Sequence, residues 1–573
     1  MLQTLTTPRG ETLSGTPWQV YPRPQMRRDS YINLNGEWDF AVSSGKPETF
    51  DMRILVPFCP ESRLSGIGRH FEEGVPMWYR RRFVLPDGFR RERVLLHIGA
   101  ADQIAEVFVN GQHLCRHEGG YASFCVDITE ALAEENELVI RCTDDLHDQA
   151  FPYGKQVMNR GGMWYTPVSG IWQTVWLESV PGTYIENLNI ENHGASVTIS
   201  TVPPLEGTVS VEPLGQFPLE NGQVTIAPEN PHFWCPDDPY LYCFTVETAQ
   251  DKVESYFAIR SLEIKKVGEY PRLCLNGKPY FFHGLLDQGY WPEGLLTAPA
   301  PESYADDILA MKRLGFNTLR KHIKVEPEEF YYQCDRLGMI VWQDMVNNGS
   351  YSYFRDTVLP TIGIQKWNDR RLHSDERSRN TFRQGAADAV NQLKNHPCIC
   401  YWTIFNEGWG QFDSDRVCGW FRTLDATRFI DTTSGWFRGK NTDVDSRHQY
   451  FGKLRLTGDG LRPLVLSEFG GKTWRVEGHI FNPDKTYGYG ACPTREALNE
   501  AVAALYRESI VPAVEKGLCA AIYTQVSDVE DEVNGLITYD RRVVKLDADT
   551  MLPISRALQD AMEKTVASFE KMG

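Results

Sequence analysis

The sequence predicts a multidomain protein in which two all-β parts, a jelly roll and an immunoglobulin-like sandwich, precede a (β/α)8 barrel. Strand-like segments with frequent turn signals fill roughly the first 265 residues, strands alternate with helical stretches from residue 266 onward, and two short apolar runs end in a glutamate. A chain of 573 residues is also too long for a single hydrophobic core. We therefore expect a jelly roll over residues 1–180, a sandwich over 181–265 and a barrel over 266–573.

The jelly-roll prediction depends on short strands joined by tight turns. Residues 94–99, 105–110 and 137–142 have strand composition, and helical periodicity is weak in this part. Asn110 and Gly111 form a strong two-residue hairpin signal, because both residue types adopt positive φ easily. A two-sheet sandwich of the jelly-roll type is the expected outcome.

The second β-rich part is smaller. Its strands include residues 196–200, 207–211 and 241–247. A segment of about 85 residues suits a compact immunoglobulin-like sandwich.

The barrel prediction depends on alternating helices and strands. Residues 304–314 and 327–337 carry apolar side chains at helical spacing, and each stretch is followed by a glycine that can end a helix. Short strands follow, over residues 316–320 and 339–344. Repeated βα units over about 300 residues predict a parallel barrel of ordinary size.

Two glutamates mark the predicted functional site. Glu407 ends the run ICYWTIFNE (399–407), and Glu468 lies near the end of PLVLSEFGG (463–471). Both runs are apolar without alternation, which is typical of buried parallel strands, and barrel enzymes carry their chemistry at the carboxyl ends of such strands. A pair of glutamates at one barrel mouth favours glycoside hydrolysis. The alternative, a salt-bridged residue at a strand end, is the usual interpretation of a single glutamate.

Composition excludes several classes of partner. The net charge of −17 argues against nucleic acid and anionic membranes, which both require a positive surface. The 15 Trp and 25 Tyr fit a carbohydrate partner, although β-sandwich cores use aromatic residues as well. Thirteen scattered cysteines without a CxxC motif indicate reduced thiols. With no apolar leader and no membrane-spanning stretch in the sequence, we expect a cytoplasmic protein.

Five segments in order resemble glycoside hydrolase family 2, which includes β-galactosidases, β-glucuronidases and β-mannosidases. They are LNGEWDF (34–40), WYRRRF (78–83), GIWQTVWLE (170–178), the junction FAIRSLEI (257–264) with LNGKP (275–279), and the two glutamate segments. Each segment is weak by itself, but the family's order over most of the chain is specific.

The resemblance implies a role for each glutamate. Glu407, which follows Asn406, matches the family's general acid/base on strand four, and Asn406 matches the residue that binds the substrate 2-hydroxyl. Glu468 on strand seven matches the nucleophile. The implied mechanism retains the anomeric configuration, with Glu407 protonated, Glu468 ionised and the two carboxyl groups roughly 5–5.5 Å apart.

The resemblance and the strand ends nominate further substrate-site residues. Arg320 is expected to support the nucleophile's carboxylate, and the tyrosine of the strand-six His-x-Tyr pair is expected to assist it. The full set, each weighed against a structural role, is Arg320, His322, Asp344, His448, Tyr450, Asp287, Trp409, Trp474 and Tyr523.

The substrate is less determined than the reaction. Family β-glucuronidases carry an Asn-x-Lys that binds the uronate, but here Asn534 has no such lysine, and Asp528, Asp531 and Glu532 lie nearby in the sequence. These acids would repel a carboxylated sugar, so we expect a neutral sugar, first a β-galactoside. An arabinoside, a uronide caught by another basic group, a mannoside, a non-catalytic carbohydrate-binding protein and a metal-dependent barrel hydrolase are left open. No metal and no cofactor are expected, and a homo-oligomer is left open.

Overall fold

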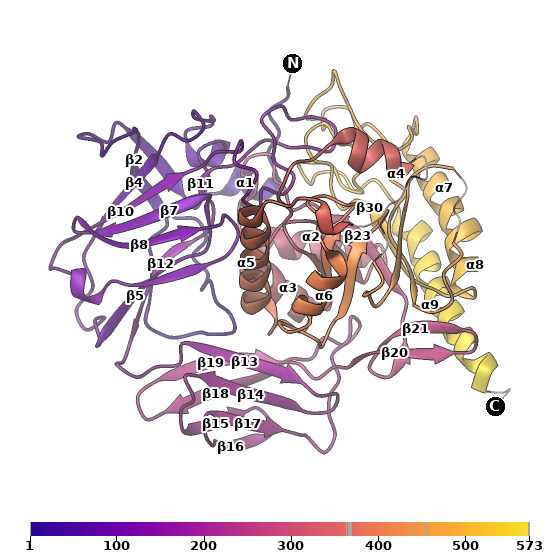
Figure 1. Cartoon of the computed structure of the whole chain (residues 1–573), viewed down its shortest axis with the longest axis horizontal. Coiled ribbons are helices and arrows are strands. Elements are labelled where there is room, and N and C mark those ends of the chain that lie inside the picture. Colours follow the sequence, from indigo (N-terminus) through magenta and orange to yellow (C-terminus); the bar gives the residue numbers. More distant parts are fainter. Residues whose placement is uncertain are drawn as a thin grey trace.

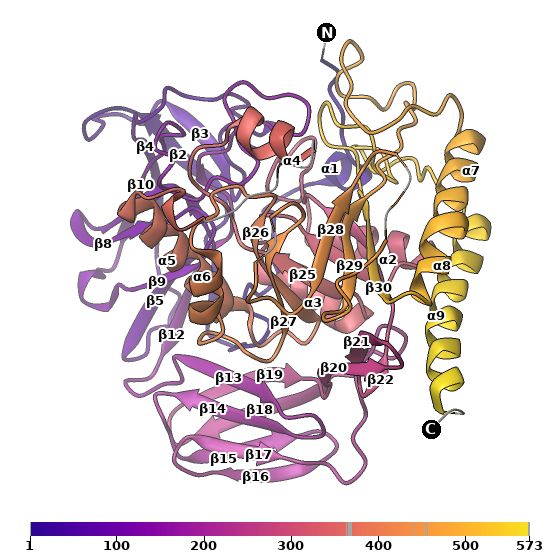
Figure 2. The same ribbon diagram turned by 45° about the vertical axis from the view of Figure 1, so that its right-hand side comes forward.

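The computed structural model describes residues 2–361, 364, 369–437, 439–452, 454 and 456–570. It confirms the predicted architecture: antiparallel β-sheets form the first half of the chain and an eight-stranded parallel sheet with surrounding helices forms the second. Figures 1 and 2 show the first β-rich part beside the barrel and the second β-rich part beneath both. None of the described helices has the length and apolar content needed to cross a membrane.

The first β-rich part contains two main antiparallel sheets. Their inner faces enclose a core of large side chains that includes Trp38, Tyr79 and Leu96. The four-stranded sheet has the order β1 (Tyr31–Asn33), β12 (Val175–Val180), β5 (Arg93–Ile98), β9 (Phe124–Asp127). The six-stranded sheet has the order β3 (Met52–Val56), β2 (Gly36–Val42), β4 (Met77–Phe83), β10 (Asn136–Thr143), β7 (Ile104–Val109), β8 (Gln112–Glu118). Asn110 and Gly111 form the predicted turn between β7 and β8, both with positive φ.

Short elements complete this part. They are the pair β6 (Ala101–Asp102) and β11 (Gly170–Ile171), the helix α1 (Pro8–Thr12), and the 3-10 turns η1 (Arg63–Ser65) and η2 (Thr129–Ala131). The segment around α1 leaves the sandwich and reaches the barrel, where the Trp18 indole donates to the Ala298 carbonyl.

The second β-rich part is a smaller sandwich. Val209, Phe244 and Phe257 lie in its core. One sheet consists of β13 (Asn187–Asn192), β14 (Val197–Val202) and β17 (Gln223–Ile226), and the other of β16 (Gly215–Leu219), β15 (Gly207–Val211), β18 (Tyr242–Thr248) and β19 (Lys252–Phe257). A small sheet of β20 (Leu262–Val267), β21 (Tyr270–Leu275) and β22 (Lys278–Pro279) then leads into the barrel. The predicted boundary at residue 265 falls inside β20, and both domain boundaries stay predictions.

The barrel strands are almost entirely buried and pair in parallel, as their apolar composition predicts. In chain order they are β23 (Phe282–Asp287), β24 (Thr318–Lys321), β25 (Ile340–Asp344), β26 (Ile399–Asn406), β27 (Phe429–Ser434), β28 (Asp445–Gln449), β29 (Leu464–Phe469) and β30 (Leu518–Thr524). Glu407 thus follows the fourth barrel strand and Glu468 lies in the seventh, with two strands between them as expected.

Helices cover the outside of the barrel (Figure 2). The two predicted helices correspond to α2 (Glu302–Arg313) and α3 (Glu328–Leu337). Gly338 ends α3 in the left-handed conformation, and its N–H donates to the Cys334 carbonyl. The helices are α2 (Glu302–Arg313), α3 (Glu328–Leu337), α4 (Leu359–Thr361), α5 (Glu376–Leu393), α6 (Ser414–Phe421), α7 (Arg495–Leu505), α8 (Val511–Val514) and α9 (Ala548–Glu570), with the π-helical turns η3 (Tyr353–Val358) and η5 (Tyr506–Ile510) and the 3-10 turn η4 (Asp369–Arg371).

Candidate active site

The backbone turns sharply after β26 and directs the Glu407 carboxylate across the barrel mouth. Glu407 has φ of +49°, a left-handed conformation that costs a non-glycine residue roughly 1–3 kcal/mol. Its N–H donates to the Ser434 carbonyl at 2.9 Å, and its Oε1 lies 2.7 Å from His448 Nδ1. The surrounding structure therefore holds this side chain in a conformation that an isolated turn would disfavour.

The Glu468 carboxylate is buried among groups that stabilise its charge. Arg320 Nη1 lies 3.0 Å from its Oε1, and the Tyr450 hydroxyl donates to its Oε2. Burial opposes ionisation, but His448, Arg320 and His322 outweigh burial and lower the pKa of Glu468 to about 2. Glu468 is therefore a carboxylate at neutral pH, as a nucleophile requires.

The two carboxylates face each other at short range. An oxygen of Glu407, an oxygen of Glu468 and a ring nitrogen of His448 all lie within 4.8 Å of one another. The Tyr450 hydroxyl bridges the pair, because it also lies 3.2 Å from Glu407 Oε1. This separation is closer to the roughly 5–5.5 Å of retaining glycosidases than to the roughly 6.5–9.5 Å of inverting ones.

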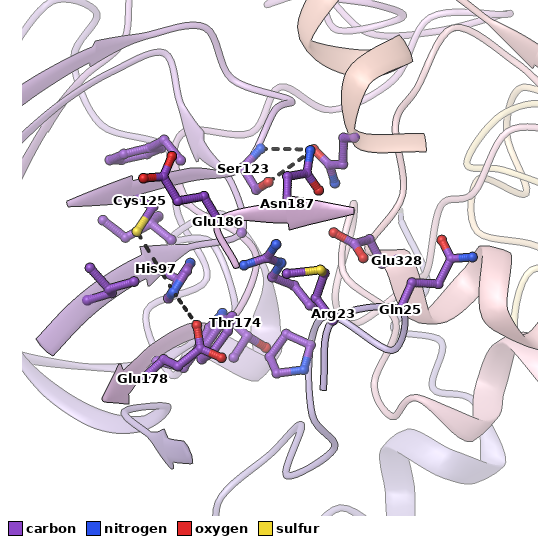
Figure 3. Close-up of a pocket in the computed structure, with 18 of the residues that line it drawn as sticks. Arg23, Gln25, His97, Ser123, Cys125, Thr174, Glu178, Glu186, Asn187 and Glu328 are labelled. Carbon is purple, nitrogen blue, oxygen red and sulfur yellow. Dashed lines mark hydrogen bonds and ion pairs between the residues drawn. The ribbon is translucent and has the colours of Figure 1, made fainter. Parts of the chain in front are cut away.

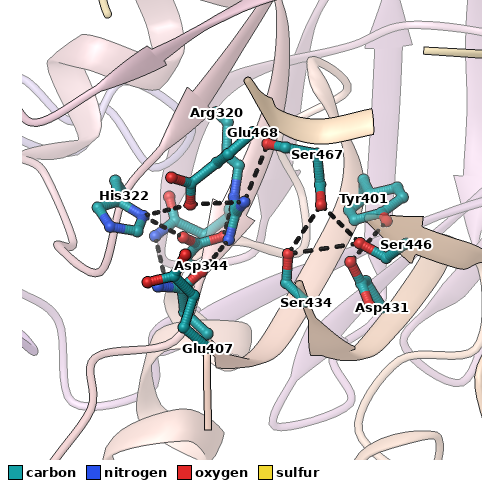
Figure 4. A network of polar contacts seen from close by, with 12 residues as sticks. Arg320, His322, Asp344, Tyr401, Glu407, Asp431, Ser434, Ser446, Ser467 and Glu468 are labelled. Carbon is teal, nitrogen blue, oxygen red and sulfur yellow. Dashed lines mark hydrogen bonds and ion pairs between the residues drawn. The ribbon is translucent and has the colours of Figure 1, made fainter. Parts of the chain in front are cut away.

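Arg320 organises the floor of this site (Figure 4). It is fully buried and donates to Asp344 Oδ1 at 3.0 Å and to Asn406 Oδ1 at 2.9 Å, in addition to Glu468. Asp344 also lies 2.8 Å from His322 Nδ1. Arg320 fixes the Asn406 amide with its oxygen inward, which leaves Asn406 Nδ2 buried without a hydrogen-bond partner in the described part of the chain.

A serine cluster closes the barrel beneath the carboxylates. The Ser446 and Ser467 hydroxyls lie 2.6 Å apart, and Ser434 Oγ lies 3.1 Å from Ser467 and 3.0 Å from His448 Nε2. Figure 4 shows these side chains next to Glu468. They join β27, β28 and β29 at the point where β27 and β28 lack ladder hydrogen bonds.

The structure thus brings together most of the predicted residues around the carboxylates. Trp409 also belongs to this group: its ring is buried, its centroid lies 6.4 Å from that of His322, and its Nε1 has no hydrogen-bond partner among the described residues. The assembled set consists of Asn406, Glu407, Trp409, Arg320, His322, Asp344, His448, Tyr450 and Glu468.

Two predicted residues lie elsewhere. Asp287 lies on the helix-facing side of the barrel wall. Its Oδ2 accepts from Lys321 Nζ at 2.6 Å. Tyr523 is fully buried between Phe469 and Tyr506.

Each of these placements corrects an expectation. In a strand, successive side chains point to opposite faces, and the side chains of Asp287 and Tyr523 both point out of the barrel. Trp474 is half-buried against the core, and its stacking role stays a prediction.

Sequence reasoning missed the residues that the jelly roll contributes to the mouth. The segment after β10 crosses to the barrel, where the Tyr165 hydroxyl donates to Glu532 Oε2 at 2.5 Å. In the same segment Trp164 stacks on Trp409 with centroids 5.2 Å apart, and the Lys155 ammonium lies 5.2 Å from the Trp409 ring. No local motif marks these residues, because their function depends on a contact between parts far apart in sequence.

Ion pairs alter the expected charge at the rim. Asp528 pairs with Lys545 at 2.6 Å, and Asp531 with Arg160 at 3.0 Å. Only Glu532 of the three nearby acids forms no ion pair with a described residue, and it accepts hydrogen bonds from Tyr165 and Asn534 instead.

A separate cavity of about 590 Å³ lies where both β-rich parts meet α3 and α5. Figure 3 shows Arg23, Gln25 and Glu328 around it. Its residue Glu178 is bonded to Arg28 at 3.0 Å and to the Tyr21 hydroxyl at 2.7 Å. None of the residues lining this cavity belongs to the carboxylate site.

Two family models match the chain. The model described as the TIM barrel domain of glycosyl hydrolases family 2 matches residues 266–454, and the glycosyl hydrolase 2 galactose-binding domain-like model matches residues 70–160.

Curated relatives are distant in sequence. A β-galactosidase of Thermoanaerobacter pseudethanolicus is 24% identical over 416 residues, which cover 66% of this chain and 52% of that protein. A β-glucuronidase of Bacteroides fragilis is 22% identical over 407 residues, which cover 66% of this chain and 56% of that protein. The chain spans about half the length of these relatives.

Solved structures share the fold along nearly the whole chain. A β-glucuronidase of an uncultured Clostridium superposes with a TM-score of 0.70 at 19% identity, over 95% of this chain and 100% of that one. A β-galacturonidase of Eisenbergiella tayi superposes with a TM-score of 0.65 at 17% identity, over 92% and 97% of the two chains.

Proposed function

The chain belongs to glycoside hydrolase family 2, and from that premise we propose that it is a retaining exo-β-glycosidase that releases a terminal sugar. The observation that carries the proposal is the carboxylate pair. Carboxylate oxygens of Glu407 and Glu468 lie within 4.8 Å, at the carboxyl ends of barrel strands. A pair this close leaves no room for a water between one carboxylate and the anomeric carbon, which an inverting enzyme needs.

In the first step, ionised Glu468 attacks the anomeric carbon while protonated Glu407 donates its proton to the glycosidic oxygen. The C–O bond to the leaving group breaks as the ester bond to Glu468 forms. Tyr450 and Arg320 hold the attacking carboxylate in place. Asn406 Nδ2, a buried donor without a protein partner, is positioned to bind a sugar hydroxyl.

In the second step, water replaces the leaving group. Glu407, now a carboxylate, takes a proton from the water while the water oxygen attacks the anomeric carbon, and the ester bond to Glu468 breaks. Two inversions at the same carbon give net retention. His448, 2.7 Å from Glu407 Oε1, orients this carboxylate through both steps.

For the sugar, we propose a neutral one, with a β-galactoside as the first candidate. Glu532 stands at the rim as a buried carboxylate with no ion pair to a described residue, which disfavours a second carboxylate on the sugar. The second candidate is a uronide, because most of the curated relatives are β-glucuronidases, the solved structures include a β-glucuronidase and a β-galacturonidase, and Lys155 brings a cation to the mouth.

A substrate panel tests this function. We expect nitrophenyl β-D-galactoside to be hydrolysed faster than the glucoside, mannoside, glucuronide, galacturonide and α-L-arabinoside. Glu468→Gln should lower kcat by roughly 10³-fold or more, since it removes the nucleophile. Glu515→Gln, at an exposed position, is the matched control and should keep the full rate. A rate that survives Glu468→Gln would refute the assignment of the nucleophile.

A further inference from the structure

The Lys155 side chain is largely buried, and its ammonium has no hydrogen-bond partner among the described residues. Only 6% of the residue is exposed, and its ammonium makes no hydrogen bond and no ion pair with any residue that the structure describes. Its recorded neighbours are the ring faces of Trp409 at 5.2 Å and Tyr165 at 5.9 Å. Aromatic faces attract an ammonium, but they offer it no hydrogen-bond acceptor of the strength of an oxygen.

Lys155 lies on the acid/base side of the barrel mouth. Trp409, which its ammonium contacts, comes two residues after Glu407 in the same turn. The charge of Lys155 also reaches His322: burial lowers the pKa of His322, and Lys155 lowers it further.

Glu532 lies on the nucleophile's side of the same mouth. Its Oε1 accepts from Asn534 Nδ2 at 3.0 Å, and Asn534 lies against Gly471, three residues after Glu468. Burial raises the pKa of Glu532, and Lys155 is the largest opposing charge. Tyr165 lies between the two side chains, because its ring is 5.9 Å from the Lys155 ammonium and its hydroxyl donates to Glu532 Oε2 at 2.5 Å, and Lys155 and Glu532 form no ion pair with each other.

The two side chains have complementary hydrogen-bonding capacity. Lys155 has three N–H donors and no hydrogen-bond acceptor among the described residues, whereas each Glu532 oxygen keeps a free lone pair after its single hydrogen bond. A hydroxyl group can accept from an ammonium and donate to a carboxylate at the same time. A sugar carboxylate could accept from Lys155 only, and it would be repelled by Glu532.

We propose that Lys155 and Glu532 together bind one hydroxyl group of a neutral sugar, with the ammonium donating to the hydroxyl oxygen and the carboxylate accepting its hydrogen. This proposal rests on the glycosidase function proposed above and deepens it, since it assigns a specificity site to a loop of the jelly roll. It gives the enzyme a physical reason to favour a neutral sugar over a uronide.

The test combines variants with deoxy substrates. Lys155→Met and Glu532→Gln should each lower kcat/KM for the preferred neutral glycoside about 10- to 100-fold, as expected for a lost charge-assisted hydrogen bond. One monodeoxy glycoside lacks the bound hydroxyl, and on that substrate kcat/KM of each variant should be close to that of the unmodified protein. A structural role would lower kcat/KM on every substrate alike. Lys516→Met, an exposed control, should change neither value.

Three results would overturn the proposal. They are unchanged kcat/KM in both variants, equal losses on every deoxy substrate, or a Lys155→Met loss confined to glucuronide or galacturonide, which would assign Lys155 to a carboxylate. Failure of the underlying function looks different, because then the unmodified protein would hydrolyse none of the glycosides. Thermal melting separates misfolded variants, and Glu532→Gln keeps the test open if Lys155→Met does not fold.

Discussion

Arg320 shows how one side chain can prepare a whole site. It donates to the proposed nucleophile Glu468, to Asp344 and to Asn406, so it fixes a charge, a buried network and an amide orientation together. The guanidinium fork suits this task, because its N–H groups point in set directions, whereas a lysine ammonium is a flexible point charge. The sequence predicted the support of Glu468 but not the simultaneous contact with Asn406.

Tyr450 should control the acid limit of activity. Its hydroxyl donates to Glu468 and contributes to the lowered pKa of about 2. In Tyr450→Phe this hydrogen bond to the charged form is lost, so the pKa of Glu468 should rise. The acid limb of the kcat/KM profile should therefore move to higher pH.

Tyr506→Phe is the matched control for this prediction. Tyr506 is also buried, but its hydroxyl has no hydrogen-bond partner among the described residues. The acid limb should stay where it is in this variant. An acid limb that is equal in the unmodified protein and Tyr450→Phe would show that the tyrosine does not stabilise the charged nucleophile.

At the scale of elements, the sequence predicted strands better than it predicted which way their side chains point. The alternation of βα units was sufficient to place Glu407 after the fourth barrel strand and Glu468 in the seventh. The prediction that Asp287 and Tyr523 face the pocket was wrong. Buried barrel strands are apolar on both faces, so periodicity does not reveal which residues point inward. Their partners, Lys321 and Phe469, became visible only in three dimensions.

A pair of buried acids should make the first β-rich part sensitive to pH. Asp102 in β6 lies near Asp144, which follows β10, and burial raises the pKa of Asp102 to about 7 from its ordinary 3.8. The folded state then binds a proton that the unfolded chain releases. Its contribution to stability is present in full at low pH and is lost as pH rises toward and through 7.

We therefore expect the Tm of the unmodified protein to fall between pH 5 and pH 8, and to fall less in Asp102→Asn, which carries no titratable group there. Thermal melting at the two pH values measures this difference. Asp87→Asn, at an exposed position, should melt like the unmodified protein. If Asp102→Asn showed the same fall as the unmodified protein, Asp102 would not be the titrating group.

At the scale of the whole molecule, the barrel mouth is completed by the jelly roll. Tyr165, Trp164 and Lys155 reach the carboxylate site from a segment more than 200 residues away from Glu407 in the sequence. The sequence predicted both parts but not this contact, since neither loop carries a motif for the other. Through this contact the first β-rich part contributes side chains to the wall of the barrel mouth.

Chelation should leave the enzyme active. Glu407, His448 and Glu468 are close enough to hold a metal ion, but the Glu468 oxygens are already bonded to Arg320 and Tyr450. The proposed steps use only carboxylates and water, so EDTA treatment and dialysis should not change kcat. Loss of activity that a divalent cation restores would favour the metal-dependent alternative.

Identification of the covalent intermediate tests the central claim most directly. A 2-deoxy-2-fluoro glycoside of the preferred sugar with a good leaving group should inactivate the protein. The fluorine slows both steps and the good leaving group speeds only the first, so the glycosyl-enzyme accumulates. Peptide mass spectrometry should then find one fluorosugar ester, on Glu468. A label on another residue, or turnover with inversion and no adduct, would contradict the double-displacement mechanism.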